Sequence, residues 1–286
     1  MAVAMAQARS LRVRHARSAV GVVSTALCAG AAAAALLLIL GYVVREGAAS
    51  ISIPFLTQVP HPVGIPGGGV ANAIAGTGIT VAIATLMAAP IGVLTGVYLA
   101  MYGRGAFASS IRFLSDVLAG VPSIAIGLFA YVVLVAPFKH FSAVSGSFAF
   151  AVLMLPVIIR TTEEAIRSVP VTIREGALAL GLPVYATTVR VVIPAARAAI
   201  VTGLLLSIAR VTGETAPLLF TAFGSQFWEL NPRNPMAQLP LQIFNYAISP
   251  YPLWHEQAWG GALVLIVVVL VLNALARVAL RSRTSR

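Results

Sequence analysis

Charged residues are scarce in this chain. Only 9% of its 286 residues are Asp, Glu, Lys or Arg, whereas 59% are hydrophobic, and the mean hydropathy is +0.94. A soluble domain carries about 25% charged residues, so this composition excludes a protein with a fully water-facing surface. The apolar residues form long runs, which the strands of membrane β-barrels lack. We therefore predict an all-α integral membrane protein in contact with membrane lipid.

Cysteine, histidine and lysine are also rare. A single cysteine, Cys28, excludes an intramolecular disulfide, and the four histidines show no metal-ligand spacing, so we predict no metal site. A Walker-type phosphate loop needs a lysine after a glycine, but the only lysine, Lys139, follows Phe138. We therefore expect neither an enzyme nor a bound cofactor. If ATP drives this protein, a separate chain hydrolyses the ATP.

Six apolar segments are each long enough to cross the hydrocarbon core of a bilayer, which takes about 20 helical residues. They cover 18–44, 72–101, 112–136, 147–167, 195–222 and 259–280. The first segment is too long for the apolar part of a cleavable signal peptide, so we interpret it as a retained helix. The expected organisation is a basic tail over 1–17, a first span over 18–44, a membrane domain over 70–280 and a short tail over 281–286.

The cations predict the orientation of these spans. The net charge is +11, and fifteen of the nineteen Lys and Arg residues fall in the two terminal segments or in the second and fourth connections. Only Arg45, Lys139 and Arg233 fall on the opposite side, and Arg210 lies within a span. Cytoplasmic segments of membrane proteins carry the excess of Lys and Arg. We therefore expect both termini in the cytoplasm, and we explain the positive charge by topology rather than by nucleic-acid binding.

The connection between the fourth and fifth spans, 160–195, is too long for a simple turn and predicts a helical hairpin. Pro170 favours a helix start, Gly181 a left-handed helix end, and Pro183 the start of a second helix. Pro194 is then expected to begin the fifth span. The pattern alone leaves two interpretations open: the hairpin fits a groove on a soluble partner, or it lies at the membrane interface and holds two spans together.

The same connection resembles the signature loop of ATP-binding-cassette importer permeases. That loop has Glu-Ala-Ala, three residues, Gly, nine residues and Ile-x-Leu-Pro. The spacing is kept here by Glu175-Gly176-Ala177, Gly181 and Val191-Val192-Ile193-Pro194, in which Gly176, Val191 and Ile193 depart from the family's residues. The resemblance implies a type I importer permease architecture with six transmembrane helices. It also implies that this loop docks into an ATPase subunit.

Two charged residues interrupt the fifth span. In "RVTGETAPLLF", Arg210 and Glu214 are four residues apart and share a face if the helix is continuous, although Gly213 and Pro217 are expected to loosen it. A charge within the membrane costs about 2.5–3.5 kcal/mol and usually faces a bundle interior or a water-filled path. One interpretation is a neutralising ion pair. The other is an anion site in which the arginine binds a tetrahedral oxyanion. The carboxylate would then orient the guanidinium or accept a proton from the oxyanion, which suits hydrogen phosphate better than sulfate.

Longer stretches are similar to the PstA-type permease subunits of the phosphate-specific transport (Pst) system. They are "DVLAGVPSIAIGL" (116–128), "LPVIIRTTEEAIRSVP" (155–170), "SIARVTGETAPLLFTAFGSQFW" (207–228) and "MAQLPLQIFNYA" (236–247). The resemblance implies a subunit of an ATP-driven phosphate importer in the bacterial inner membrane, with Arg210, Glu214 and Arg160 along the phosphate path. The partners it implies are inorganic phosphate, a PstC-type permease subunit, two PstB-type ATPase subunits and a PstS-type external binding protein.

The role of Arg160 and the transported substrate each have an alternative interpretation. Arg160 is equally well explained as a positive charge that fixes topology, and Asp116 is expected to pair with Arg112, one helical turn before it. A permease of the same mechanism for sulfate or molybdate stays open. An ion-coupled secondary transporter fits less well, because we see no inverted repeat of the kind common in that class.

The external connection, 223–258, is expected to have internal structure. It holds five prolines, which exclude one long helix. Its aromatic residues are typical of a membrane interface, the interpretation that we favour for Trp254 and Trp259. The resemblance implies that part of this connection also contacts the external binding protein.

Overall fold

The computed structural model describes residues 2–281, and the regular structure of this part of the chain is helical, which confirms the predicted all-α class. The long helices are α1 (Ala2–Ala48), α3 (Ala71–Met101), α7 (Ala143–Arg167), α10 (Ile193–Thr212) and α13 (Pro252–Arg281). The shorter elements are α2 (Ile53–Thr57), α4 (Gly105–Gly120), α5 (Ser123–Ala130), η1 (Tyr131–Val135), α6 (Ala136–Phe138), α8 (Val171–Ala179), α9 (Val184–Thr187), η2 (Thr188–Val192), α11 (Ala216–Thr221) and α12 (Leu239–Ala247), of which η1 and η2 are π-helical.

Five helices of the described residues are long and apolar enough to cross a membrane, and the number rises to six if one bent pair is a single span. The bent pair is Gly105–Gly120 with Ser123–Phe138, whose axes meet at 104°. The predicted span over 112–136 is therefore bent at a break and is not one continuous helix. Pro122 causes the break, because the residue before a proline is driven out of the helical region, and Val121 has an extended backbone with ψ 131°.

The predicted helix over 195–222 is also interrupted. α10 ends at Thr212, Gly213 is its C-cap, and α11 begins at Ala216 with Pro217 in its first turn. The expected loosening by Gly213 and Pro217 thus takes the form of a complete break. At its other end the span starts earlier than predicted, at Val184, and runs through η2 into α10. Pro194 therefore lies inside the span rather than at its start.

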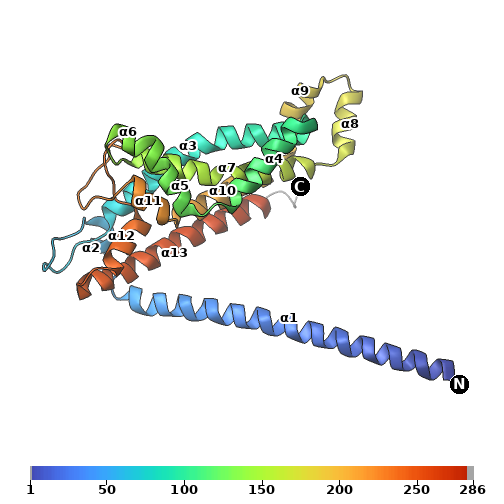
Figure 1. The fold of residues 1–286 in the computed structure, drawn as a ribbon, viewed down its shortest axis with the longest axis horizontal. Helices are drawn as coiled ribbons and strands as arrows, with labels where there is room; N and C mark the ends of the chain where they lie inside the picture. The colour runs from blue at the N-terminus through green and yellow to red at the C-terminus, as the bar shows by residue number, and fades with distance from the viewer. Residues whose placement is uncertain (1, 282–286) are drawn as a thin grey trace.

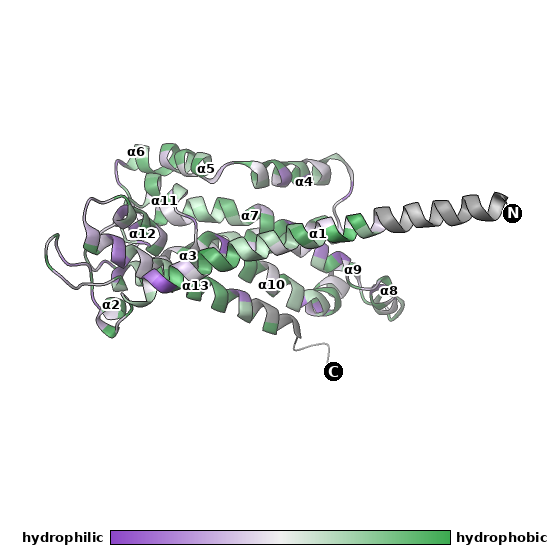
Figure 2. Cartoon of the chain, turned by 90° about the horizontal axis from the view of Figure 1, so that it is seen from below, coloured by the Kyte–Doolittle hydropathy of each residue, from purple (hydrophilic) through white to green (hydrophobic). Residues whose placement is uncertain are grey.

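The helices form a bundle with connections gathered at its two ends (Figure 1). The α8–α9 hairpin lies at one end, and α2, α12 and the loops beside them lie at the other (Figure 1). α1 packs on α13 through an edge-to-face contact of Tyr42 and Trp259 and diverges from the bundle toward its N-terminal end (Figure 1). Apolar residues predominate along the long helices (Figure 2), as expected where side chains face lipid or a helix core.

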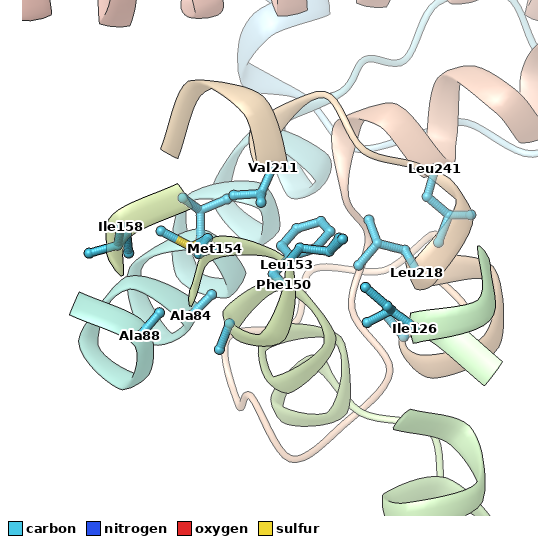
Figure 3. Packing of buried hydrophobic residues seen from close by; sticks show 13 residues of the cluster. Ala84, Ala88, Ile126, Phe150, Leu153, Met154, Ile158, Val211, Leu218 and Leu241 are labelled. Atoms are coloured by element: carbon cyan, nitrogen blue, oxygen red, sulfur yellow. The ribbon is translucent and has the colours of Figure 1, made fainter. Parts of the chain in front are cut away.

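α7 is the central helix of the core. Its residues Phe150, Met154 and Ile158 are almost fully buried against neighbouring helices that include α3, α5 and α11 (Figure 3). α3 lies so close to α7 that a Cβ added at Gly92 would come within 2.7 Å of the Ile158 side chain. Close approach of this kind is how small residues let helix backbones pack in membranes. The α3–α7 pair therefore forms a rigid centre for the remaining elements.

Candidate functional site

The loop predicted to dock a partner forms the expected helix, sharp turn and helix. α8 ends in a turn at Gly181, whose φ of +83° lies in the left-handed region that favours glycine. The chain then continues into α9 and η2, and Ile193 and Pro194 form the first turn of α10. Within the hairpin, Ala177 is buried while Glu175 and Gly176 are exposed.

The hairpin stands at the end of the bundle rather than between two spans. α8 packs mainly on α9 and η2, which follow it in the chain (Figure 1). Several of its large apolar side chains are exposed, among them Leu180 at 86% and Tyr185 at 70% of their full accessible surface. An apolar surface of this kind at the end of a membrane bundle is typical of an interaction site.

The two charged residues of the interrupted span do not form an ion pair. Arg210 lies in the last turn of α10 and is exposed, whereas Glu214 lies beyond the C-cap and is half-buried. Among the described residues no carboxylate oxygen comes within 4.0 Å of the Arg210 guanidinium. The neutralising pair is therefore wrong for this structure, because the break at Gly213 removes the helical geometry that the pairing required.

Arg160 lies on α7 and takes part in two ion pairs. Its guanidinium is 3.8 Å from Asp116 of α4 and 3.3 Å from Glu164, one turn further along α7. All three side chains are more than half exposed. The predicted pair of Arg112 with Asp116 is thus wrong: Asp116 faces Arg160, and Arg112 has a different partner.

That partner is Glu163, a residue that the sequence interpretation missed. Its side chain is only 4% exposed, with Arg112 at 2.8 Å and Arg167 at 2.6 Å from one carboxylate oxygen. The spacing of Glu163 and Arg167, four residues on one helix, was visible in the sequence. Nothing in the sequence indicated that Arg112, which is 51 residues away, completes the cluster.

At the opposite end, the external connection is joined to the bundle by polar contacts. The backbone N–H groups of Ala143 and Val144 donate to the carbonyls of Asn234 and Pro232. The amide of Gln238 donates to Thr80 of α3 at 3.2 Å. A pocket of about 240 Å³ lies beside α12 and is lined in part by Gln238. The connection has the expected internal structure, because it contains helix α12.

Two titratable groups of the external connection have shifted pKa values. The side chain of Asn234 and the backbone N–H of Asn231 donate to the Glu229 carboxylate, which lowers the pKa of that group. Burial raises the pKa of the Tyr246 hydroxyl, because the phenolate form would lose its hydration. Among the described residues there is no group of three or more His, Cys, Asp or Glu side chains that could hold a metal ion.

Comparison with known proteins gives a family match over more than half of the chain. Residues 92–283 match the family model described as "Binding-protein-dependent transport system inner membrane component". The chain is 44% identical over 244 residues to a phosphate transport system permease protein PstA of Yersinia pestis, which covers 85% of this chain and 83% of the relative. It is also 44% identical over 209 residues to PstA 1 of Mycobacterium tuberculosis strain H37Rv, which covers 72% of this chain and 68% of the relative.

Solved structures support the same architecture. The chain is similar to a subunit in an inward-facing structure of the MetNI methionine ABC transporter, with a TM-score of 0.64 and 14% identity over 80% of this chain and 98% of that one. This likeness shows the fold, a type I importer permease architecture. The chain therefore belongs to the family of binding-protein-dependent transport system inner membrane components and, within it, to the phosphate transport system permease proteins PstA.

Proposed function

We propose that this chain is the membrane-spanning permease subunit of an ATP-driven complex that imports inorganic phosphate. The observation that carries the proposal is the 44% identity to PstA proteins over more than four fifths of the chain. Membership of a binding-protein-dependent family also argues against the ion-coupled secondary transporter. The proposed partners are a second permease subunit of the PstC type, two ATPase subunits of the PstB type and an external phosphate-binding protein of the PstS type.

The proposed phosphate path includes Arg210 and Glu214. The break between α10 and α11 leaves the Arg210 guanidinium exposed, and no carboxylate of the described residues neutralises it. Its planar fork of donors matches a tetrahedral oxyanion. Glu214 lies within the break, where it can accept the proton of a hydrogen phosphate. Because the two charges are separate, the structure supports an anion site better than a self-neutralised pair.

Arg160 is a second proposed contact on the path, on the side of the α8–α9 hairpin. Its guanidinium already faces Asp116 and Glu164 at the protein surface. An anion that passes there competes with these two carboxylates, so binding is expected to be weak. Weak binding suits a site from which the anion leaves.

Phosphate uptake by cells tests the Arg210 assignment. Cells that lack their own high-affinity phosphate system would carry the wild-type complex or its Arg210→Gln variant at equal membrane abundance. We expect the variant to lose roughly 100-fold or more of its uptake, since a site built for a charge-assisted contact is left without it. Arg45→Gln is a matched control, because Arg45 is also exposed but lies in the last turn of α1, a helix that carries no residue of the proposed path.

Sulfate and molybdate are the competing substrates in the same assay. Uptake of phosphate alone supports the proposed substrate. Wild-type uptake of sulfate or molybdate in place of phosphate would show a permease for another oxyanion. Full uptake by Arg210→Gln would remove Arg210 from the path.

The proposed ATPase-docking loop comprises Glu175, Gly176, Ala177 and Gly181 with the helix start at Ile193 and Pro194. The exposed apolar surface of the hairpin and its position at the end of the bundle support docking over a purely structural role. This arrangement leaves ATP hydrolysis to the partner subunit, in line with the absence of a Walker-type lysine in the sequence. The proposed orientation places the hairpin and both termini in the cytoplasm.

Two substitutions at Gly181 test docking by co-purification of the ATPase subunit. Space around Gly181 is open, but its positive φ strains most side chains. Gly181→Trp adds both strain and bulk, so we expect the ATPase to be lost while the permease still inserts into the membrane. Asparagine tolerates the left-handed conformation, so we expect Gly181→Asn to retain the bound ATPase subunit. Equal recovery of the ATPase with both variants would contradict docking through this turn.

A further inference from the structure

α4 is only weakly packed against the other helices of this chain. It forms the first half of the broken span, and only Ala108 and Ser115 of its residues are buried. Large apolar side chains such as Phe107 and Phe113 are two-thirds exposed. Apolar packing within this chain therefore fixes the position of α4 only in part.

Two ion pairs also connect α4 to α7. Asp116 of α4 lies 3.8 Å from Arg160 of α7 at the surface. One turn earlier, Nε of Arg112 donates to the buried Glu163 carboxylate at 2.8 Å. The surface pair is worth little, because water screens it. The buried pair is harder to separate, since parting it breaks a charge-assisted hydrogen bond to a carboxylate that is only 4% exposed.

Arg112 also reaches the end of α3. Its Nη2 donates to the carbonyl of Leu99 at 2.8 Å, in the last turn of α3, where carbonyl groups have no partner within the helix. One side chain thus joins α4 to the ends of both α3 and α7. Because α3 and α7 are packed tightly through Gly92 and Gly96, we identify α4 as the element of this group that is able to shift.

Glu163 also binds the residue at the end of α7 that leads into the proposed docking loop. Arg167, the last residue of α7, binds the same carboxylate oxygen at 2.6 Å. Arg167 also lines a pocket of about 200 Å³ together with Val171 and Arg174 of α8. Only Ser168, Val169 and Pro170 separate the end of α7 from α8. One carboxylate oxygen of Glu163 therefore binds both an arginine of α4 and the arginine that leads into the proposed docking loop.

We propose that Glu163 is a positioning residue that transmits movement of the docking loop to α4. The inference rests on the proposed function, because it needs an ATPase subunit that moves the loop. When the loop moves the Arg167 side chain, the Glu163 carboxylate moves with it, and α4 follows through Arg112. Arg160 lies one turn before Glu163 and faces Asp116 of α4, so the same movement changes the surroundings of a proposed phosphate contact.

The test is the number of phosphate ions transported per ATP hydrolysed. The complete complex, with its partner subunits and binding protein, would be reconstituted in liposomes with wild-type permease or with Glu163→Gln. We expect Glu163→Gln to retain ATP hydrolysis but to transport roughly tenfold less phosphate per ATP, a typical size for the coupling between two sites. Glu46→Gln is the control, because Glu46 is an exposed carboxylate paired with Arg45 on α1.

The outcomes separate a positioning role from a structural one. If uptake and ATP hydrolysis fall in the same proportion, or if Glu163→Gln transports at the wild-type ratio, the inference is overturned. If Glu163→Gln fails to assemble, Glu163→Asp replaces it in the test, since aspartate keeps the charge but is too short to reach Arg112 in the same way. A lowered ratio of phosphate transported to ATP hydrolysed in Glu163→Asp supports the inference, and the wild-type ratio overturns it. A wild-type complex that hydrolyses ATP without moving phosphate would instead contradict the proposed function.

Discussion

Glu229 organises a turn of the external connection by accepting two hydrogen bonds. The backbone N–H of Asn231 donates to one carboxylate oxygen and the side-chain amide of Asn234 to the other, each at 2.8 Å. Asn234 in turn accepts the backbone N–H of Ala143 at the start of α7. The negative charge on Glu229 therefore helps to hold this loop against the bundle, although the carboxylate is exposed to water.

This contact makes the order of the loop dependent on pH. The pKa of Glu229 is lower in the folded loop than in an unfolded chain, so the contact stabilises the loop above the usual pKa of about 4.3 and is lost as the pH falls through the lower folded value. We expect the protection of the Asn231 and Arg233 amides, measured as hydrogen exchange relative to an unfolded peptide at the same pH, to decrease below about pH 4.3 in the wild type. Glu229→Gln should show low protection at every pH. Protection that does not change with pH in the wild type would contradict the role of the carboxylate.

Residue contacts also show where prediction from the sequence ends. One of the two interpretations paired Arg210 with Glu214 because their spacing matches one helical turn, but that pairing required a continuous helix. Glu163 escaped notice because Arg112 lies on another helix, 51 residues earlier. Spacing predicts contacts within a helix, whereas contacts between helices depend on packing that a single sequence does not display.

The two broken spans pack against each other at their breaks. α5 follows the break at Pro122, and α11 follows the break at Gly213. A Cβ built on Gly127 of α5 would lie 2.6 Å from the Cα atom of Pro217 in α11. Backbone atoms cannot move aside as a flexible side chain can, so this contact requires a glycine. The fit of α5 against α11 holds the interrupted segments in place.

Replacing Gly127 by alanine should therefore destabilise the protein. Overpacking in a well-packed core costs about 1–3 kcal/mol, and we expect a matching decrease in the midpoint of thermal unfolding in detergent. Gly120→Ala is the control, because no atom lies within 4 Å of a Cβ at that position, at the end of α4. An equal effect of the two substitutions would mean that the α5–α11 contact is not as tight as the structure places it.

At the scale of the whole molecule, the arginines and the connections distinguish two ends of the bundle. Arg112, Arg167 and Arg174 lie near the α8–α9 hairpin, and the N-terminal end of α1 points toward the same end (Figure 1). The loop that carries Arg233 packs at the start of α7, at the opposite end. This separation is the arrangement expected if the hairpin end faces the cytoplasm.

Thiol labelling tests that orientation. In a Cys28→Ala background, Leu180→Cys and Leu230→Cys each place one thiol at an exposed leucine, the first on the hairpin and the second on the external connection. We expect a membrane-impermeant maleimide to label Leu230→Cys in intact spheroplasts and Leu180→Cys only after permeabilisation. The reverse pattern would invert the topology and place the proposed docking loop away from any cytoplasmic ATPase.

The sequence by itself determined the helical membrane class, the regions of the spans and the spacing of the proposed docking loop. These features are local, because each apolar segment must satisfy its own backbone hydrogen bonds in lipid, and a turn such as that at Gly181 depends on its own residues. Only the tertiary structure decided that Arg210 has no carboxylate partner among the described residues and that Glu163 joins α4 to the end of α7. Ion pairs between helices form or fail according to how the helices pack, and that packing depends on contacts between residues distant in the chain.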